Sequence, residues 1–86
     1  MPQISRFFGI IISMFFEDHN PPHFHAQYGE FEAIISIDDL SILEGNLPSR
    51  ALGLVIEWAS TNKQSLIENW QLVMSNNPPK KIKPLK

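Results

Sequence analysis

The side chains with the clearest chemical potential lie in one segment, Glu17–His25, which holds all three histidines of the chain. Residues two apart on a strand project from the same face, so His23 and His25 would present two imidazoles side by side. This spacing suits zinc, nickel, manganese or iron, and Asp18 or His19 could complete the ligand set. The prolines within the segment would hold the ligands in a fixed geometry. A divalent metal is therefore the one cofactor that the sequence suggests.

Two other interpretations of these histidines stay open. They could simply cap the turn by bonding to backbone carbonyls and to Asp18, which is the most frequent role for such residues. They could also transfer protons without a metal, which would need a partner such as Arg6 or Glu32 within about 3 Å of a substrate group. A phosphate-cradling glycine loop and a nucleophile elbow are both missing from the sequence, so it leaves open whether the chain is an enzyme.

The basic residues give weaker indications of function than the histidines do. Arg6 lies among apolar residues near the N-terminus, where it could contact an anion or pair with Glu30 or Glu32. Segment 80–86 carries four lysines in seven residues and could neutralise phosphates or dock on an acidic partner. The candidate contacts in this tail are Lys80, Lys81 and Lys83. The formal net charge of -2 argues against a dedicated nucleic-acid-binding domain, although it permits local contacts.

Length and composition predict a single domain in a reducing compartment. A chain of 86 residues leaves room for one core, and the absence of cysteine excludes disulfides, thiolate zinc sites and a cysteine nucleophile. The apolar run Phe7–Phe16 lacks a small-residue cleavage site and is far shorter than the ~20 residues needed to span a bilayer. We therefore expect a cytoplasmic protein that makes no contact with a membrane.

The first half of the chain has the composition of a small antiparallel sheet. Strand-forming residues fill 4–8 and 10–16, and Gly9 between them favours one long strand with a bend over a hairpin. His23–Tyr28 and Phe31–Ile37 read as two more strands joined by a two-residue turn at Gly29 and Glu30. Residues 42–46 are either a connecting loop or the stub of a further strand.

The second half is patterned for helix. Pro48 suits a first helical position, and apolar residues then recur at steps of three and four as far as Met74. Thr61 and Gln64 have the spacing of a capping box, so either one long helix or two shorter helices fits. The sequence thus predicts an α+β domain over residues 1–79, with three or four antiparallel strands and the helices packed on one face, followed by a basic C-terminal tail over residues 80–86.

Several segments together resemble one known family, the small prokaryotic domain-of-unknown-function family numbered four-one-six-zero. Its most specific part matches the Asp-His-x-Pro-Pro-His-x-His pattern, and the resemblance extends over nearly the whole chain. The positions that match the motif are Asp18, His19, Pro21, Pro22, His23 and His25, with Arg6 and Arg50 as the matching basic positions. The further matching segments are Pro2–Ile10, Leu47–Ala51, Glu57–Ala59, Glu68–Trp70 and Pro79–Ile82.

This resemblance implies a bacterial protein whose gene often lies beside that of a second small family, numbered two-four-four-two, as in a toxin-antitoxin pair. It assigns no catalytic role to any matching residue. The leading hypothesis is therefore a component of a toxin-antitoxin-like pair that binds a small partner protein through the histidine segment. The alternatives are a metal-dependent enzyme such as a nuclease, which would use the histidine cluster, and a homo-oligomeric structural module.

Overall fold

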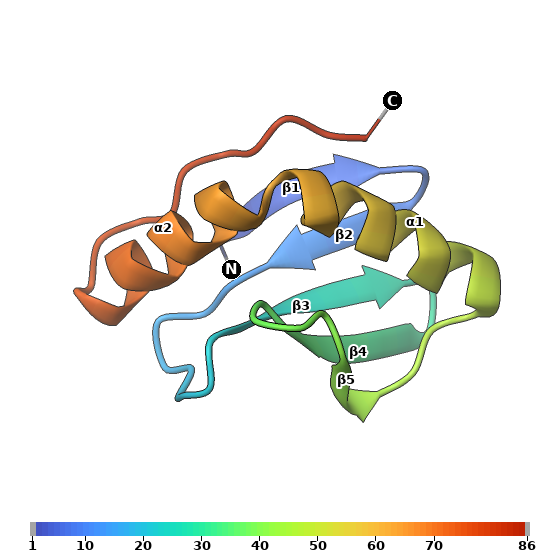
Figure 1. Cartoon of the computed structure of the whole chain (residues 1–86), viewed down its shortest axis with the longest axis horizontal. Coiled ribbons are helices and arrows are strands. Elements are labelled where there is room, and N and C mark those ends of the chain that lie inside the picture. Colours follow the sequence, from blue (N-terminus) through green and yellow to red (C-terminus); the bar gives the residue numbers. More distant parts are fainter. Residues whose placement is uncertain (1, 86) are drawn as a thin grey trace.

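Five antiparallel strands form one sheet, and two helices follow it in the computed structural model, which describes residues 2–85. Figure 1 shows both helices on the same side of this sheet. Each strand pairs with the next one along the chain, in the spatial order β1-β2-β3-β4-β5. The bounds are β1 Gln3–Phe7, β2 Ile10–Ser13, β3 His23–Tyr28, β4 Phe31–Ser36, β5 Ile42–Gly45, α1 Ser49–Thr61 and α2 Lys63–Met74. The α+β class is confirmed.

The first two strands form a hairpin, so the expectation of one long strand bent at Gly9 was wrong. Phe7 pairs with Ile10, and the two residues between them have positive φ angles of 50° for Phe8 and 80° for Gly9. This is the conformation of a tight two-residue hairpin turn. An aromatic residue is rare in its first position, which is why Phe8 read as part of a strand. The alternation of β2 puts Ile10 and Ile12 in the core.

The sheet has five strands, whereas the sequence predicted three or four. The turn at Gly29 and Glu30 joins β3 to β4 as expected, with Tyr28 opposite Phe31. The additional strand is β5, the segment that the sequence left undecided between loop and strand, and it pairs with β4. All four of its residues are exposed. A short edge strand without a buried face lacks the alternation that identifies strands in a sequence.

The helical half contains two helices that meet at Asn62. The expected capping box at Thr61 and Gln64 is not formed, because Asn62 takes the N-cap position of α2 and no side chain caps it. The Thr61 hydroxyl instead donates to the carbonyl oxygen of Trp58 at 3.0 Å, which helps to end α1. Neither helix in residues 2–85 is long and apolar enough to cross a membrane.

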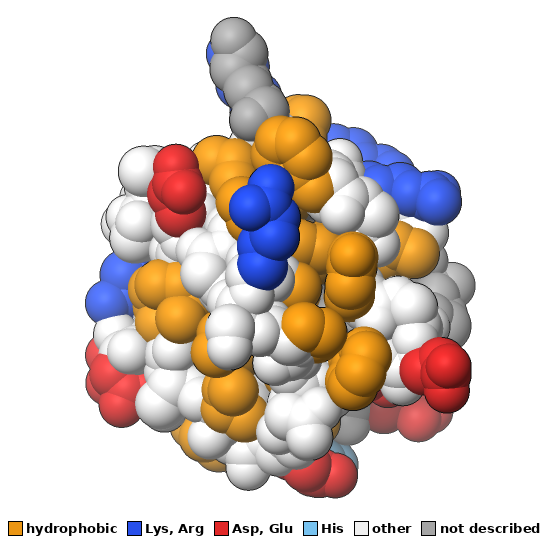
Figure 2. Space-filling view, turned by 90° about the vertical axis from the view of Figure 1, so that its right-hand side faces the viewer, with side chains coloured by type: hydrophobic (Ala, Val, Ile, Leu, Met, Phe, Trp, Pro, Cys, Tyr) orange, Lys and Arg blue, Asp and Glu red, His pale blue; other side chains and the backbone are white. Residues whose placement is uncertain are grey.

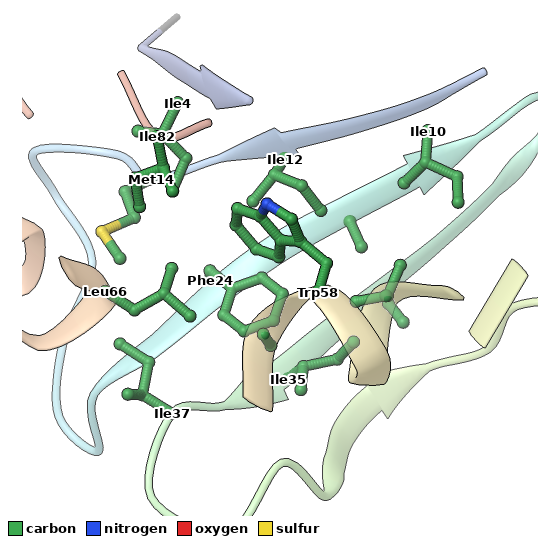
Figure 3. Packing of buried hydrophobic residues seen from close by; sticks show 14 of the residues in the cluster. Ile4, Ile10, Ile12, Met14, Phe24, Ile35, Ile37, Trp58, Leu66 and Ile82 are labelled. Atoms are coloured by element: carbon green, nitrogen blue, oxygen red, sulfur yellow. The ribbon is translucent and has the colours of Figure 1, made fainter. Parts of the chain in front are cut away.

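Trp58 occupies the centre of the core, between the sheet and α1. Its ring is fully buried, with centroids 5.3 Å from that of Phe7 and 6.1 Å from that of Phe24. Figure 3 shows the indole among isoleucines of the sheet, while Leu66 of α2 packs beside Phe24 and Ile37. A buried aromatic ring of this size removes roughly 150–250 Å² of surface from water, so these few large side chains account for much of the stability of a small domain.

The C-terminal segment lies against the domain along the first strand. Ile82 is buried, and its N–H donates to the carbonyl oxygen of Ile4 at 2.7 Å. The buried amide of Asn69 in α2 makes two hydrogen bonds of 2.8 Å to the backbone N–H and carbonyl of Lys80. The indole N–H of Trp58 donates to the carbonyl of Lys83 at 2.9 Å. The bond from Ile82 covers part of the edge that β1 would otherwise expose, and the bonds from Asn69 and Trp58 hold the segment against the helices.

Candidate metal centre

The loop between β2 and β3 brings Asp18 beside the start of β3. The backbone N–H of Asp18 donates to the carbonyl of Phe15 at 3.1 Å, and the N–H of Phe15 donates to Oδ2 of Asp18 at the same distance. At the far end of the loop, the carbonyl of Pro22 accepts from the N–H of Ile37 at 3.0 Å. The loop is therefore fixed at both ends, and the Asp18 carboxylate is held by its own backbone turn.

His23 and His25 project from the same side of β3, as their spacing predicted. Phe24 between them is fully buried in the core, so alternation along β3 directs both imidazoles away from the Phe24 side, and His23, at the first position of the strand, still contacts Trp70 of α2. The side chains of His23 and His25 are 11% and 15% exposed, and that of Asp18 is 13% exposed. All three groups are thus shielded from solvent but reachable from it.

Three ligand atoms converge at this point, one each from Asp18, His23 and His25, and they lie within 4.8 Å of one another. Nε2 of His23 is 3.5 Å from Oδ2 of Asp18, and Nε2 of His25 is 3.3 Å from Oδ1. Ligands that each lie about 2.1 Å from a zinc ion at a tetrahedral angle are about 3.4 Å apart. The observed spacing fits two ligands of one metal ion; the 3.3 Å contact between His25 and Asp18 is also within hydrogen-bond distance, although it is longer than the 2.7–2.9 Å typical of a hydrogen bond between an imidazolium and a carboxylate.

The outer nitrogen of each ring already has an acceptor. Nδ1 of His23 lies 2.7 Å from the carbonyl oxygen of Pro21, which can only accept, so this nitrogen carries the proton. Nδ1 of His25 lies 3.3 Å from a carboxylate oxygen of Glu32. His25 has a carboxylate oxygen 3.3 Å from each of its ring nitrogens, so either nitrogen can carry the proton. The Nε2 atoms of both rings face the Asp18 carboxylate, and a cation between these three groups would take a lone pair from each of them.

Neighbouring side chains hold both imidazoles in place. The ring of Phe15 meets that of His25 edge to face, with centroids 4.5 Å apart, and the ring of Trp70 lies 5.1 Å from that of His23. Sequence reasoning did not place Phe15 or Trp70 in this site, whereas it named Glu32 as a possible partner of the histidines in proton transfer. The register that follows from the two-residue turn after Tyr28 puts Glu32 diagonally across from His25 on the same face.

The other sequence candidates lie apart from these three ligands. His19 is in the same loop but exposed, and within residues 2–85 the ligand cluster does not include it. Arg6 is exposed on β1, two strands away from His25. Arg50 begins α1 and lines a hollow with Tyr28, at the opposite end of β3 from His23. The three candidate lysines of the tail are exposed: Lys80, Lys81 and Lys83.

Comparison with known proteins agrees with the resemblance seen in the sequence. The family model described as "Domain of unknown function (DUF4160)" matches residues 9–71, a range that includes the whole histidine segment and most of both helices. No curated protein and no solved structure matches the chain. Because the matched range covers well over half of the sequence, the chain belongs to the family of the domain of unknown function DUF4160.

Proposed function

We propose that this protein binds a divalent transition metal through Asp18, His23 and His25 and uses it for hydrolysis. One observation carries the proposal: both Nε2 atoms point at one carboxylate, while both Nδ1 atoms already have acceptors. Histidine ligands in metal proteins characteristically donate their other N–H to a carbonyl or a carboxylate. Pro21 and Glu32 supply one acceptor of each kind.

The donor set favours zinc and its neighbours over magnesium or calcium. Two imidazoles and one carboxylate suit zinc, iron, nickel or cobalt, whereas magnesium and calcium prefer sites made only of oxygen ligands. A dipositive ion would also balance the charges of Asp18 and of Glu32. Electrostatics and donor chemistry thus support the same class of ion.

Three protein ligands are the number found in catalytic zinc sites, where a water molecule takes the fourth position. Such a metal lowers the pKa of its bound water to about 7 and so supplies hydroxide near neutral pH. The partial exposure of the three ligand side chains, between 11% and 15%, gives that position access to a small substrate. Hydrolysis is therefore the reaction class that we propose, with phosphate esters as the first substrates to assay.

The binding step is tested with cobalt(II), whose visible absorption reports a tetrahedral site with nitrogen ligands. The wild-type chain should give an intense d–d spectrum at one equivalent of cobalt, and His23→Ala, His25→Ala and Asp18→Asn should each weaken binding at least tenfold. His19→Ala is the matched control, because this histidine lies in the same loop outside the cluster, and it should leave the titration unchanged. Equal binding by wild type and His25→Ala would overturn the proposal.

The hydrolysis step is tested separately on the metal-loaded protein. Chromogenic phosphate monoesters and diesters, together with single-stranded RNA, are incubated with wild type, with Asp18→Asn and with wild type plus chelator. Turnover that requires both the metal and Asp18 would support hydrolysis. Metal binding without turnover on any of these substrates would restrict the proposal to a binding site.

We also propose a second function, the binding of a small partner protein encoded by a neighbouring gene, as in a toxin-antitoxin-like pair. The supporting observation is Phe16, which lies two residues before Asp18 and is 43% exposed. An exposed aromatic ring beside the family motif is typical of a contact residue in a protein interface.

Co-expression tests this second function. The neighbouring product should co-purify with the wild-type chain, and Phe16→Ser should reduce the recovered complex without altering the circular dichroism of the free protein. The absence of a complex, together with no effect of either protein on growth, would rule out the pair. His19→Ala again serves as a variant from the same exposed loop.

A further inference from the structure

The end of the sheet farthest from the histidines exposes three aromatic rings. Phe8, Tyr28 and Phe31 are 55%, 38% and 45% exposed, and we refer to them as the aromatic end. Tyr28 stands opposite Phe31 in the sheet, and Tyr28 and Phe8 line the same hollow. These residues lie near the N-terminus of α1, where the helical layer begins. The apolar surface beside this end of the core is therefore left partly uncovered.

Phe8 combines an unfavourable backbone conformation with an exposed aromatic side chain. Its φ of 50° lies in the left-handed region, which is a genuine outlier for a bulky residue. Asparagine would fit this turn position better and would place no aromatic ring in water. Backbone strain of this kind concentrates at functional sites. Burial of the Phe8 ring does not offset the strain here, because the ring lies at the surface. A contact made outside the monomer would account for both features.

One basic residue, Arg50, lines the hollow beside Phe8. The hollow measures about 260 Å³ and is lined by Phe8, Tyr28, Arg50 and Leu54, among others. Figure 2 views the end of the molecule at the right of Figure 1 and shows hydrophobic side chains gathered there, with basic and acidic side chains among them. Aromatic residues and arginine are enriched in protein interfaces relative to the rest of the surface.

We infer that the aromatic end is a self-association surface whose occupant is a second copy of this chain. The charges at this end complement one another across a twofold axis: Arg50 borders the hollow, and Glu30 lies in the turn between Tyr28 and Phe31. Within residues 2–85 neither Arg50 nor Glu30 forms an ion pair. In a twofold dimer Arg50 of each copy faces Glu30 of the partner, so two identical ion pairs flank the stacked rings.

The size of the surface sets the expected strength of the dimer. An aromatic side chain buries roughly 150–250 Å², so three rings that are about half exposed offer roughly 300 Å² on each copy. A standard interface buries about 800 Å² on each partner. Because the rings cover less than half of that area, the rim must supply the remainder, and we expect a dissociation constant in the micromolar range or weaker.

Sedimentation equilibrium from about 5 μM to 1 mM tests this inference independently of metal binding. The wild-type mass should rise from that of a monomer toward that of a dimer. Phe8→Asn removes the ring while suiting the left-handed turn, and it should weaken association at least tenfold with an unchanged circular dichroism spectrum. A mass that stays monomeric up to 1 mM would overturn the inference and leave this end to a different partner.

Charge exchange identifies the surface used. Arg50→Glu and Glu30→Arg should each weaken the dimer several-fold, and the two together should restore it to within about threefold of wild type. Glu57→Arg, a charge reversal at an exposed position of α1, is the control and should have no effect. A dimer that persists in Phe8→Asn, or single charge variants that the double variant fails to rescue, would overturn the assigned interface.

Discussion

The Asn69 amide is the residue through which α2 holds the C-terminal segment. It is 2% exposed and makes two hydrogen bonds of 2.8 Å to the backbone of Lys80. Each such bond contributes about 1 kcal/mol net, so Asn69→Ala should lower the free energy of unfolding by about 2 kcal/mol. In a domain of this size that loss corresponds to a fall in Tm of about 8–16 °C.

A double-mutant cycle separates this contact from a general effect on the helix. The second change removes residues 80–86, which deletes both bonding groups of Lys80. In the truncated chain Asn69→Ala should cost less than about 0.5 kcal/mol, because the amide no longer has its partners. Urea unfolding monitored by tryptophan fluorescence measures all four corners of the cycle.

The exposed Asn77 provides the matched control, and Asn77→Ala should change stability by no more than about 0.5 kcal/mol. The reasoning is refuted if Asn69→Ala costs the same in the full-length and truncated chains. That result would place the role of Asn69 within α2 and not in anchoring the C-terminal segment.

Three further predictions concern the site, the sheet and one loop. Glu32→Gln should weaken metal binding about tenfold in a calorimetric titration. Loss of an acceptor that bonds to a histidine ligand costs about 10–100-fold in metal affinity, and we expect the lower end because the Glu32 side chain is 57% exposed. An affinity equal to that of wild type would exclude Glu32 from the site. Gly45→Ala should destabilise the fold by at least about 1–2 kcal/mol, because φ is +81° and a Cβ would collide with the carbonyl oxygen of Glu32. Gly53→Ala is the control, and it should stabilise the fold by up to about 1 kcal/mol because a Cβ at this helical position meets no neighbouring atom. Hydrogen bonds from Ser41 hold the pKa of Asp39 below its ordinary 3.8. Ionised Asp39 therefore stabilises the fold at pH values above its ordinary pKa, and this contribution is lost as the pH falls through the lowered pKa. Ser41→Ala should raise the pKa of Asp39 in an NMR titration. An unchanged pKa would contradict this assignment.

The sequence predicted those parts of the fold that have strong periodicity or a clear turn signal. The hairpin of β3 and β4 followed from Gly29 and Glu30, and the helical half followed from apolar residues that recur at steps of three and four as far as Met74. The bend at Gly9 was wrong because Phe8 occupies a turn position that aromatic residues rarely take. β5 was uncertain because an exposed edge strand need not alternate.

The three candidate ligands were named from the sequence, whereas the aromatic side chains that pack around them were not. His23 and His25 share a face because strand geometry requires it, and Asp18 was a named candidate from the same segment. The contacts of Trp70 with His23 and of Phe15 with His25 depend on how α2 and the loop pack against the sheet. Such contacts between distant segments leave no spacing rule in the sequence.

Metal content is the most direct test of the central claim that Asp18, His23 and His25 form a metal site. The native protein, purified without chelators, is compared by elemental analysis with a variant that carries both His23→Ala and His25→Ala. Both samples are also measured after incubation with zinc and removal of the unbound ion. We expect about one transition-metal ion per wild-type chain and none above background in the double variant. Equal metal content in the two proteins, or none in wild type even after incubation with zinc, would contradict the claim.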